Sequence, residues 1–205
     1  MIGSILAGGE NRRIPYIKGL LKVNGLTIIE RNLNILKQIF HRVVISTNSP
    51  EIYFPFGVPL IGDIIKERGP MAGIFSVLVS AWVEPVFVIA CDMPFVKKEL
   101  IVYMKDRFEE LSLRNDIDAM IPRFNGQVEP LFGIYNPSIK DRVEESLKAG
   151  QKGLYVFLQN INTVYIEEQE IRDVDPDGLS FVNINTLEDY EKIGGKRCLV
   201  WGCKS

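Results

Sequence analysis

The sequence has few of the residues that build disulfide frameworks or zinc sites. Its 205 residues include 3 cysteines and 1 histidine. Cys198 and Cys203 lie close together, but the histidine, His41, is far from them in the sequence. A structural zinc site needs four ligands, and three cysteines do not make a disulfide framework in a chain of this length. We therefore interpret Cys198 and Cys203 as incidental residues of a C-terminal tail.

An excess of charge of either sign is also absent. Lys and Arg number 24 and Asp and Glu 26, which gives a net charge of -2 at pH 7 with the histidine neutral. A chain so close to balance has no basic face for bulk binding of nucleic acid and is not disordered by charge repulsion. We expect no nucleic-acid partner, and any bound anion must be held by a local cluster.

Long apolar runs are missing as well. The longest, such as VFVIAC at residues 86–91, are far shorter than the roughly 20 residues that span a membrane as a helix. The N-terminus has no basic segment followed by a long apolar one, as a secretory signal would have. We expect a cytoplasmic protein without membrane contact.

What the sequence does contain is a regular alternation of short apolar runs with helical patterns. This alternation is typical of a mostly parallel sheet that helices cover on both faces. The predicted strands are Ile2–Leu6, 42–47, 85–90, 118–121 and 131–135. We expect an α/β protein with a Rossmann-like, three-layer fold, whose sheet becomes mixed from about residue 118 onward.

Helical patterns separate the predicted strands. Thr27 and Glu30 fit a capping box that starts the first helix, and apolar residues then recur on one helical face. A second helix is expected after GPMAG and a third up to Leu111. Thr186 and Asp189 fit another capping box, which starts a closing helix. We therefore expect one domain at 1–193 and a loosely held extension at 194–205.

Several polar or glycine-rich segments follow the predicted strands. They are LAGG after the first strand, TNSP after the second, GD before GPMAG, and CDMP after the third. In an open α/β sheet, ligands bind beyond the carboxyl ends of the strands. We expect these segments to converge on one crevice.

The first of these segments, which continues as LAGGENRRIPYIK, combines two glycines with three basic residues. Gly8 and Gly9 can adopt positive φ, so that backbone N–H groups form a nest for phosphate. Arg12, Arg13 and Lys18 add the charge that a diphosphate or triphosphate requires. The segment is neither a Walker loop nor a GxGxxG motif. Its alternative interpretation is a tight turn followed by solvated arginines.

Asp92 directly follows the apolar run PVFVIAC and precedes Met93 and Pro94, so the end of the strand fixes its carboxylate. A hard oxygen ligand at this position suits Mg²⁺ that bridges to phosphate oxygens. The alternative is that Asp92 caps the helix predicted at 96–111.

Three further features leave two interpretations each. GPMAG offers a surface of small residues on which a flat base packs, or it simply starts a helix with proline in the first turn. Asn183 and Asn185 alternate along a strand-like run, so both face one side and hold phosphate or metal, or they merely precede the last helix. Glu129 lines the pocket of a second substrate, or it lies exposed at the rim.

Five blocks occur in order along the chain: LAGGxxxRxxxxK, GPMAG, ACDMPF, VEPLFGIY and FVNINTLED. Their order and separation over residues 1–193 resemble the molybdenum cofactor guanylyltransferase family. That family belongs to a larger nucleotidyltransferase fold, which includes the sugar-nucleotide pyrophosphorylases. The resemblance therefore implies the nucleotidyltransferase fold for this chain.

The resemblance also implies roles for particular residues. The implied nucleotide-binding residues are Leu6, Ala7, Gly8, Gly9, Lys18, Asn48, Asp63, Gly73 and Asp92. Arg13, Lys18 and Asp92 match the family's catalytic positions, with Asp92 as the Mg²⁺ ligand. Asn183 and Asn185 match the paired asparagines near the metal or the pterin. Glu129 completes the group expected near this second substrate.

The chain departs from the family at one place. The family's first motif usually reads Arg-Met-Gly, where this chain has Arg13, Ile14 and Pro15. Proline fixes φ and has no N–H group. The loop therefore offers one donor fewer to a phosphate.

The implied reaction is transfer of GMP from GTP to the phosphate of Mo-molybdopterin, with release of pyrophosphate. The implied cofactor is Mg²⁺, and the implied partners are GTP, the molybdenum cofactor and proteins that deliver this cofactor. Two alternatives stay open. One is a related nucleotidyltransferase that uses CTP or a sugar-phosphate acceptor, and the other is a non-catalytic nucleotide-binding carrier of the cofactor.

Overall fold

A computed structural model of the chain describes residues 1–8, 16–66, 69–151 and 153–194. Part of the predicted phosphate-binding loop lies outside these residues, including Gly9, Arg12 and Arg13, as does the Ile14-Pro15 departure. The two cysteines of the tail lie outside them as well. Predictions that concern these residues therefore stay predictions.

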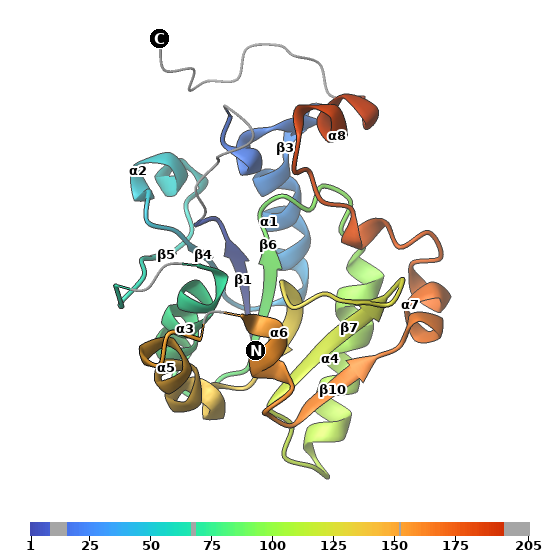
Figure 1. The fold of residues 1–205 in the computed structure, drawn as a ribbon. Helices are drawn as coiled ribbons and strands as arrows, with labels where there is room; N and C mark the ends of the chain where they lie inside the picture. Colours follow the sequence, from blue (N-terminus) through green and yellow to red (C-terminus); the bar gives the residue numbers. More distant parts are fainter. Residues whose placement is uncertain (9–15, 67–68, 152, 195–205) are drawn as a thin grey trace.

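A mixed sheet of eight strands forms the centre of the molecule (Figure 1). Its strands are β1 (Ile2–Leu6), β4 (Val43–Ser46), β5 (Leu60–Ile61), β6 (Val86–Ala90), β7 (Ala119–Phe124), β8 (Gln127–Val128), β9 (Phe132–Tyr135) and β10 (Thr163–Ile166). Their order is β10-β7-β9-β6-β1-β4-β5, and β8 pairs with β7. Along this order only β9 runs antiparallel to its neighbours. The mostly parallel, mixed sheet is confirmed.

Helices cover both faces of the sheet (Figure 1). On one face lie α1 (Ile28–Ile39), α4 (Lys98–Ser112) and α7 (Glu168–Val174), and on the other α3 (Pro70–Ala81), α5 (Lys140–Lys148) and α6 (Leu154–Leu158). Along β1, Ile5 packs into the first layer and Leu6 into the second, because successive side chains of a strand point to opposite faces. The predicted three-layer architecture is confirmed.

Short elements surround the carboxyl ends of the central strands. They are η1 (Lys18–Leu20), β2 (Lys22–Val23), β3 (Leu26–Thr27), α2 (Pro50–Tyr53), η2 (Phe54–Phe56), η4 (Leu179–Phe181) and α8 (Leu187–Lys192), while η3 (Pro137–Ile139) precedes α5. The strands β2 and β3 form a separate antiparallel hairpin. This hairpin, the short β5 and the edge strand β10 were not among the predicted elements.

Both predicted capping boxes are present. The backbone N–H of Glu30 donates to the Thr27 hydroxyl, and the Glu30 carboxylate accepts from the Thr27 backbone N–H at 2.8 Å. The same reciprocal pair joins Thr186 and Asp189 at the start of α8. Each box satisfies N–H groups that a helix start leaves without an intrahelical partner. The closing helix ends at Lys192, next to the predicted domain boundary, which stays a prediction.

One local prediction is wrong. Residues 182–185, expected to be strand-like, form no strand but an extended connection between η4 and α8. The backbone N–H of Ile184 is bonded to the carbonyl of Asp92, and its side chain is buried with Leu21 and Tyr190. Backbone bonds from Val182 to Leu179 and from Ile184 to Asp92, hydrogen bonds of Asn185 and packing hold this segment, and it pairs with no described strand as a ladder. Within the described residues, no helix has the length and apolarity needed to cross a membrane.

Candidate active site

The segments expected to converge do meet at one edge of the sheet. Strands β1, β4 and β6 are neighbours and run in the same direction, so the residues that follow them share this edge. Backbone bonds extend the pairing past the strand ends: the N–H of Ala7 donates to Ser46 and that of Cys91 to Leu6. Gly8, Asn48 and Asp92 are thus carried by adjacent, rigid strands.

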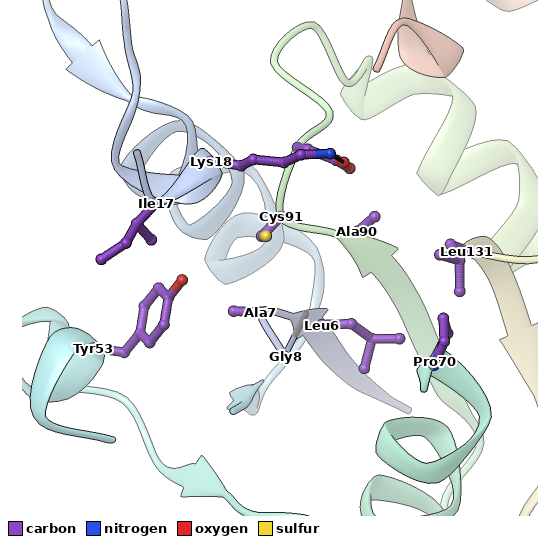
Figure 2. A pocket seen from close by; sticks show the side chains of 11 residues that line it. Leu6, Ala7, Gly8, Ile17, Lys18, Tyr53, Pro70, Ala90, Cys91 and Leu131 are labelled. Atoms are coloured by element: carbon purple, nitrogen blue, oxygen red, sulfur yellow. Dashed lines mark hydrogen bonds and ion pairs between the residues drawn. The ribbon is translucent and has the colours of Figure 1, made fainter. Parts of the chain in front are cut away.

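A cavity of about 170 Å³ opens between these strand ends (Figure 2). Its lining residues are Leu6, Ala7, Gly8, Ile17, Lys18, Tyr53, Pro70, Ala90, Cys91, Asp92 and Leu131. The predicted residues among them are the LAG turn, Lys18 and Asp92. Ile17, Cys91 and Leu131 lie within the predicted segments LAGGENRRIPYIK, CDMP and the strand at 131–135, but none of the three was predicted individually as a site residue. Tyr53 lies in none of these segments and was missed.

Lys18 links the two ends of the chain at this cavity. Its ammonium Nζ donates to Oδ2 of Asp92 at 2.9 Å and to Oδ1 of Asn185 at 2.8 Å. The Lys18 and Asp92 side chains are 19% and 18% exposed, so the ion pair is partly shielded from water but open to a ligand. Residues 18, 92 and 185 therefore form one polar cluster, which we call the charged cluster.

Asp92 is held rigidly at the end of β6. Its backbone carbonyl accepts a hydrogen bond from Ile184 at 3.0 Å, and the next carbonyl, of Met93, accepts one from the buried Asn32 side chain at 3.1 Å. The alternative that Asp92 caps a helix is wrong, because α4 starts after Lys97 and no side chain caps it. Its carboxylate is instead directed toward Lys18.

The two asparagines of FVNINT have different contacts. Asn185 accepts from Lys18, and its backbone N–H donates to the Asp189 carboxylate at 3.0 Å. This bond is the largest cause that lowers the pKa of Asp189 below its ordinary range. Within the part of the chain that the structure describes, the Asn183 amide group donates only to the backbone carbonyl of Phe181, at 3.4 Å. Asn185 therefore belongs to the charged cluster, whereas Asn183 lies beside it.

A second polar group lies at the ends of β4 and β5. Asn48 donates from Nδ2 to Oδ2 of Asp63 at 2.6 Å, and the Asp63 backbone N–H donates to Oδ1 of Asn48 at 2.9 Å. We call these two residues the amide–carboxylate pair. A Cβ on Gly73 would lie 3.1 Å from Oγ of Ser46 and 3.9 Å from Oδ1 of Asp63. Glycine thus lets α3 approach the strands and this pair closely.

GPMAG also starts α3. Pro70 is at the first position of the helix, and Gly69 has a φ of 129°, a value that L side chains rarely adopt. The helix-initiation interpretation is therefore confirmed, and it is compatible with the small-residue surface because Gly73 lies one turn further along.

Glu129 lies near the cavity but is not one of its lining residues. Its side chain is half-buried and makes no hydrogen bond or ion pair within the described residues. Burial raises the pKa of this carboxyl. Leu131, two residues further on, does line the cavity, so Glu129 is a neighbour of the site rather than a wall of it.

The charged cluster also suits a divalent cation. The Asp92 carboxylate and the Asn185 amide oxygen are hard oxygen ligands of the kind that Mg²⁺ prefers. In the described part of the chain no three His, Cys, Asp or Glu residues gather into a metal site. An ion held here would take its remaining ligands from phosphate oxygens and water, as Mg²⁺ commonly does in sites for nucleotides.

Fold and site together define the class of the protein. A parallel α/β sheet carries a glycine turn, a lysine and an aspartate around one cavity at its carboxyl edge, where such sheets bind nucleotides. A family model described as MobA-like NTP transferase domain matches residues 3–165. The chain belongs to this family, and it is a nucleotidyltransferase.

Individual relatives are similar over nearly the whole chain. A protein named probable molybdenum cofactor guanylyltransferase from Peptoclostridium acidaminophilum is 38% identical over 189 residues, which are 92% of this chain and 86% of the relative. A molybdenum cofactor guanylyltransferase from Syntrophotalea carbinolica is 34% identical over 188 residues, 92% of this chain and 88% of the relative.

A solved structure is similar as well. The crystal structure of molybdopterin-guanine dinucleotide biosynthesis protein A from Archaeoglobus fulgidus matches with a TM-score of 0.82 at 29% identity. The match covers 94% of this chain and 96% of that one. It includes the C-terminal half of the sheet, where the sequence alone predicted least.

Proposed function

We propose that this protein is a molybdenum cofactor guanylyltransferase, which transfers GMP from GTP to the terminal phosphate of Mo-molybdopterin and releases pyrophosphate. The observation that carries the proposal is the charged cluster. Lys18 bridges Asp92 and Asn185 beside the cavity that Gly8 lines. This arrangement occurs in a chain 34–38% identical to relatives that carry this name.

The reaction joins two polyanions, so the site must offset their repulsion and align them. Backbone groups of Leu6, Ala7, Gly8 and Gly9 are proposed to hold the phosphates of GTP, because a glycine turn exposes its N–H groups. Lys18 is proposed to neutralise the leaving pyrophosphate. Positioning and electrostatic stabilisation are the main sources of rate in phosphoryl transfer.

The proposed step forms one bond and breaks one. An oxygen of the acceptor phosphate attacks the α-phosphorus of GTP, and the bond from this phosphorus to the oxygen that bridges to the β-phosphate breaks. The electron pair leaves with pyrophosphate, whose growing charge Lys18 is placed to offset. Arg13, which lies outside the described residues, is proposed to share this role. Because the transfer is direct, no covalent intermediate between GMP and a residue of the cavity is needed.

Mg²⁺ is the proposed cofactor. Asp92 would hold it, with the amide oxygen of Asn185 as a neighbouring oxygen ligand, and the ion would supply positive charge to the phosphates. In the structure the Lys18 ammonium satisfies both oxygens. The cluster therefore already accommodates one positive charge between them, which supports the assignment.

The remaining predicted residues divide between the two substrates. Asn48 and Asp63 are proposed to contact the base and ribose of GTP, with Gly73 leaving room for the base. Asn183, Asn185 and Glu129 are proposed to lie near the molybdenum cofactor. The proposed partners are GTP, this cofactor and proteins that deliver it.

The direct test is incubation of the purified protein with GTP, Mg²⁺ and molybdenum cofactor, followed by mass analysis of the pterin. We expect a product heavier by one GMP, together with one pyrophosphate per product. Parallel reactions with CTP, ATP and UTP measure the choice of base. A preference for CTP would mean that CTP, and not GTP, is the nucleotide substrate. A protein that binds nucleotide but forms no pyrophosphate with any of the four would be a carrier, and the proposal would be wrong.

A further inference from the structure

Tyr53 places a hydroxyl group at the cavity, and none of the described residues forms a hydrogen bond with it. The residue ends α2, and its side chain lies across the cavity from Pro70 and Leu131 (Figure 2). It is only 2% exposed, yet its Oη makes no hydrogen bond within the described residues. By contrast, Tyr103 donates to Glu170 at 2.7 Å and Tyr135 donates to the carbonyl of Pro130 at 2.6 Å.

The neighbours of this hydroxyl do not replace a partner. A Cβ on Gly19 would lie 3.5 Å from Oη of Tyr53, so the hydroxyl lies against a residue that has no side chain. Burial raises the pKa of Tyr53, which therefore keeps its proton as a donor at neutral pH.

Tyr53 is a buried residue, but its Oη is not one of the fully enclosed side-chain atoms without a partner, which among the described residues are Oγ of Ser4 and Oδ1 of Asn32. The hydroxyl therefore opens onto the cavity that Tyr53 lines, where water or a ligand oxygen can accept its hydrogen bond. The same cavity is lined by Gly8, Lys18 and Asp92, the residues assigned above to the phosphates. Asn48 and Asp63, assigned to the base and ribose, do not line it. The acceptor that fits this wall is a phosphate oxygen.

We propose that Tyr53 is a positioning residue whose Oη donates a hydrogen bond to a phosphate oxygen of the bound nucleoside triphosphate. This inference rests on the proposed function, in which the cavity holds the phosphates of GTP. Tyr53 then contacts the triphosphate from α2, whereas the Lys18 side chain extends away from Tyr53 toward Asp92 (Figure 2). The triphosphate is held between a neutral donor and a charged one.

The test compares Tyr53→Phe with Tyr103→Phe, which removes a paired hydroxyl that does not line the cavity. Calorimetry measures the binding of GTP, inorganic tripolyphosphate and guanosine in the presence of Mg²⁺. Since a hydrogen bond to a charged group is lost, we expect Tyr53→Phe to raise the Kd of GTP and of tripolyphosphate about tenfold. Guanosine binding stays unchanged, and Tyr103→Phe changes none of the three.

Thermal unfolding without ligand separates binding from a purely structural role. We expect Tyr53→Phe to leave Tm unchanged, because the hydroxyl makes no hydrogen bond within the described residues and its removal breaks none there. Tyr103→Phe lowers Tm, since it loses a hydrogen bond. A lower Tm for Tyr53→Phe with an unchanged Kd for GTP would overturn the inference, as would a loss of guanosine binding equal to that of GTP.

The outcome is distinguishable from failure of the proposed function. If the unaltered protein forms the GMP adduct of the pterin while Tyr53→Phe binds GTP normally, the role of Tyr53 is wrong and the function stands. If Tyr53→Phe weakens GTP and tripolyphosphate as expected but no protein forms the adduct, the function is wrong and the phosphate contact stands. Absence of GTP binding by the unaltered protein overturns both.

Discussion

The two polar groups at the active edge differ in how the chain builds them. The charged cluster joins residues 18, 92 and 185, and its longest contact spans 167 positions of sequence. The amide–carboxylate pair joins residues only 15 positions apart. The first carries an ammonium group, a carboxylate and an amide around a cavity, and the second carries one carboxylate and one amide beside Gly73. The first suits phosphate and metal, and the second suits the hydrogen-bonding groups of a nucleoside.

The sharpest test of this division is removal of the carboxylate of Asp92. Asp92→Ala is expected to lower turnover by about two orders of magnitude or more, the scale of losing a principal electrostatic stabiliser. Stability changes little because the carboxylate is partly exposed. Turnover and circular dichroism are measured together. Asp118→Ala, whose carboxylate pairs with Arg142 and does not line the cavity, is the matched control and keeps its turnover. A folded Asp92→Ala protein with near-normal turnover would exclude the role.

The next effect comes from the positive charge. Lys18→Met is expected to weaken GTP binding about 10- to 100-fold, because charge-assisted hydrogen bonds to phosphate are lost. Guanosine, which has no phosphate, is expected to bind as before. Calorimetry with both ligands checks this, and Lys105→Met, which removes an ammonium paired with Glu109 on α4, is the control. An equal loss for the two ligands would contradict the assignment of Lys18 to phosphate.

For the amide–carboxylate pair we expect binding of guanosine to be weakened as well as binding of GTP, unlike for Lys18. Asp63→Ala removes the acceptor of the Asn48 amide and is expected to weaken GTP and guanosine equally, by about tenfold. The same substitution is expected to reduce discrimination between GTP and CTP. Calorimetry with the three ligands measures both effects. Loss of GTP binding alone would instead place phosphate at this pair, and the contrast between the two groups would disappear.

The smallest effect concerns the support behind Asn185. Asp189→Ala removes the capping box of α8 and the acceptor of the Asn185 backbone N–H. The expected loss is about 1 kcal/mol of stability, measured by urea unfolding, with turnover lowered only a few-fold. Thr27→Ala removes the equivalent cap of α1 and serves as the control for a cap away from Asn185. A large loss of turnover would show that α8 has a more direct role.

The same residue gives a pH dependence. The pKa of Asp189 is lowered from its ordinary value of 3.8, first through the hydrogen bond from the backbone N–H of Asn185. Because the folded protein favours the ionised form, this contribution to stability is complete at neutral pH. It is lost as the pH falls below 3.8 through the lowered pKa. Asp189→Asn is expected to remove this part of the acid dependence of urea unfolding, and an unchanged profile would contradict a contribution from the Asp189 carboxylate.

Local signals made the N-terminal half of the fold predictable. The apolar runs of β1, β4 and β6 are buried along their whole length, and the capping boxes depend on residues three positions apart. β5 has only two residues, and all but the last residue of β10 are half-buried, so neither has the fully buried apolar pattern of the central strands. Their pairing is decided by neighbouring strands, which local patterns do not record.

Individual residues of the candidate site were predictable from the sequence, but the hydrogen bonds that join them were not. Asp92 and Lys18 were found because each follows a recognisable segment. Asn185 was one of two asparagines whose alternation left two interpretations open, and the family resemblance favoured the site. That Lys18 bridges Asp92 and Asn185 depends on the packing of Ile184 against Leu21, which no spacing reveals. Tyr53 was missed because an aromatic residue in a short helix is ordinarily a core residue. Only the structure shows that its hydroxyl lies at a cavity and has no hydrogen-bond partner among the described residues.

The central claim is that the charged cluster binds phosphate and metal, whereas the amide–carboxylate pair binds the nucleoside. A crystal structure with a non-hydrolysable GTP analogue and Mn²⁺ tests this division most directly, since anomalous scattering locates the ion without ambiguity. We predict an ion at the Asp92 carboxylate, the triphosphate against Gly8 and Lys18, and the guanine and ribose toward Asn48 and Asp63. An ion remote from Asp92, or a triphosphate seated at the amide–carboxylate pair with the base in the cavity, would contradict this division.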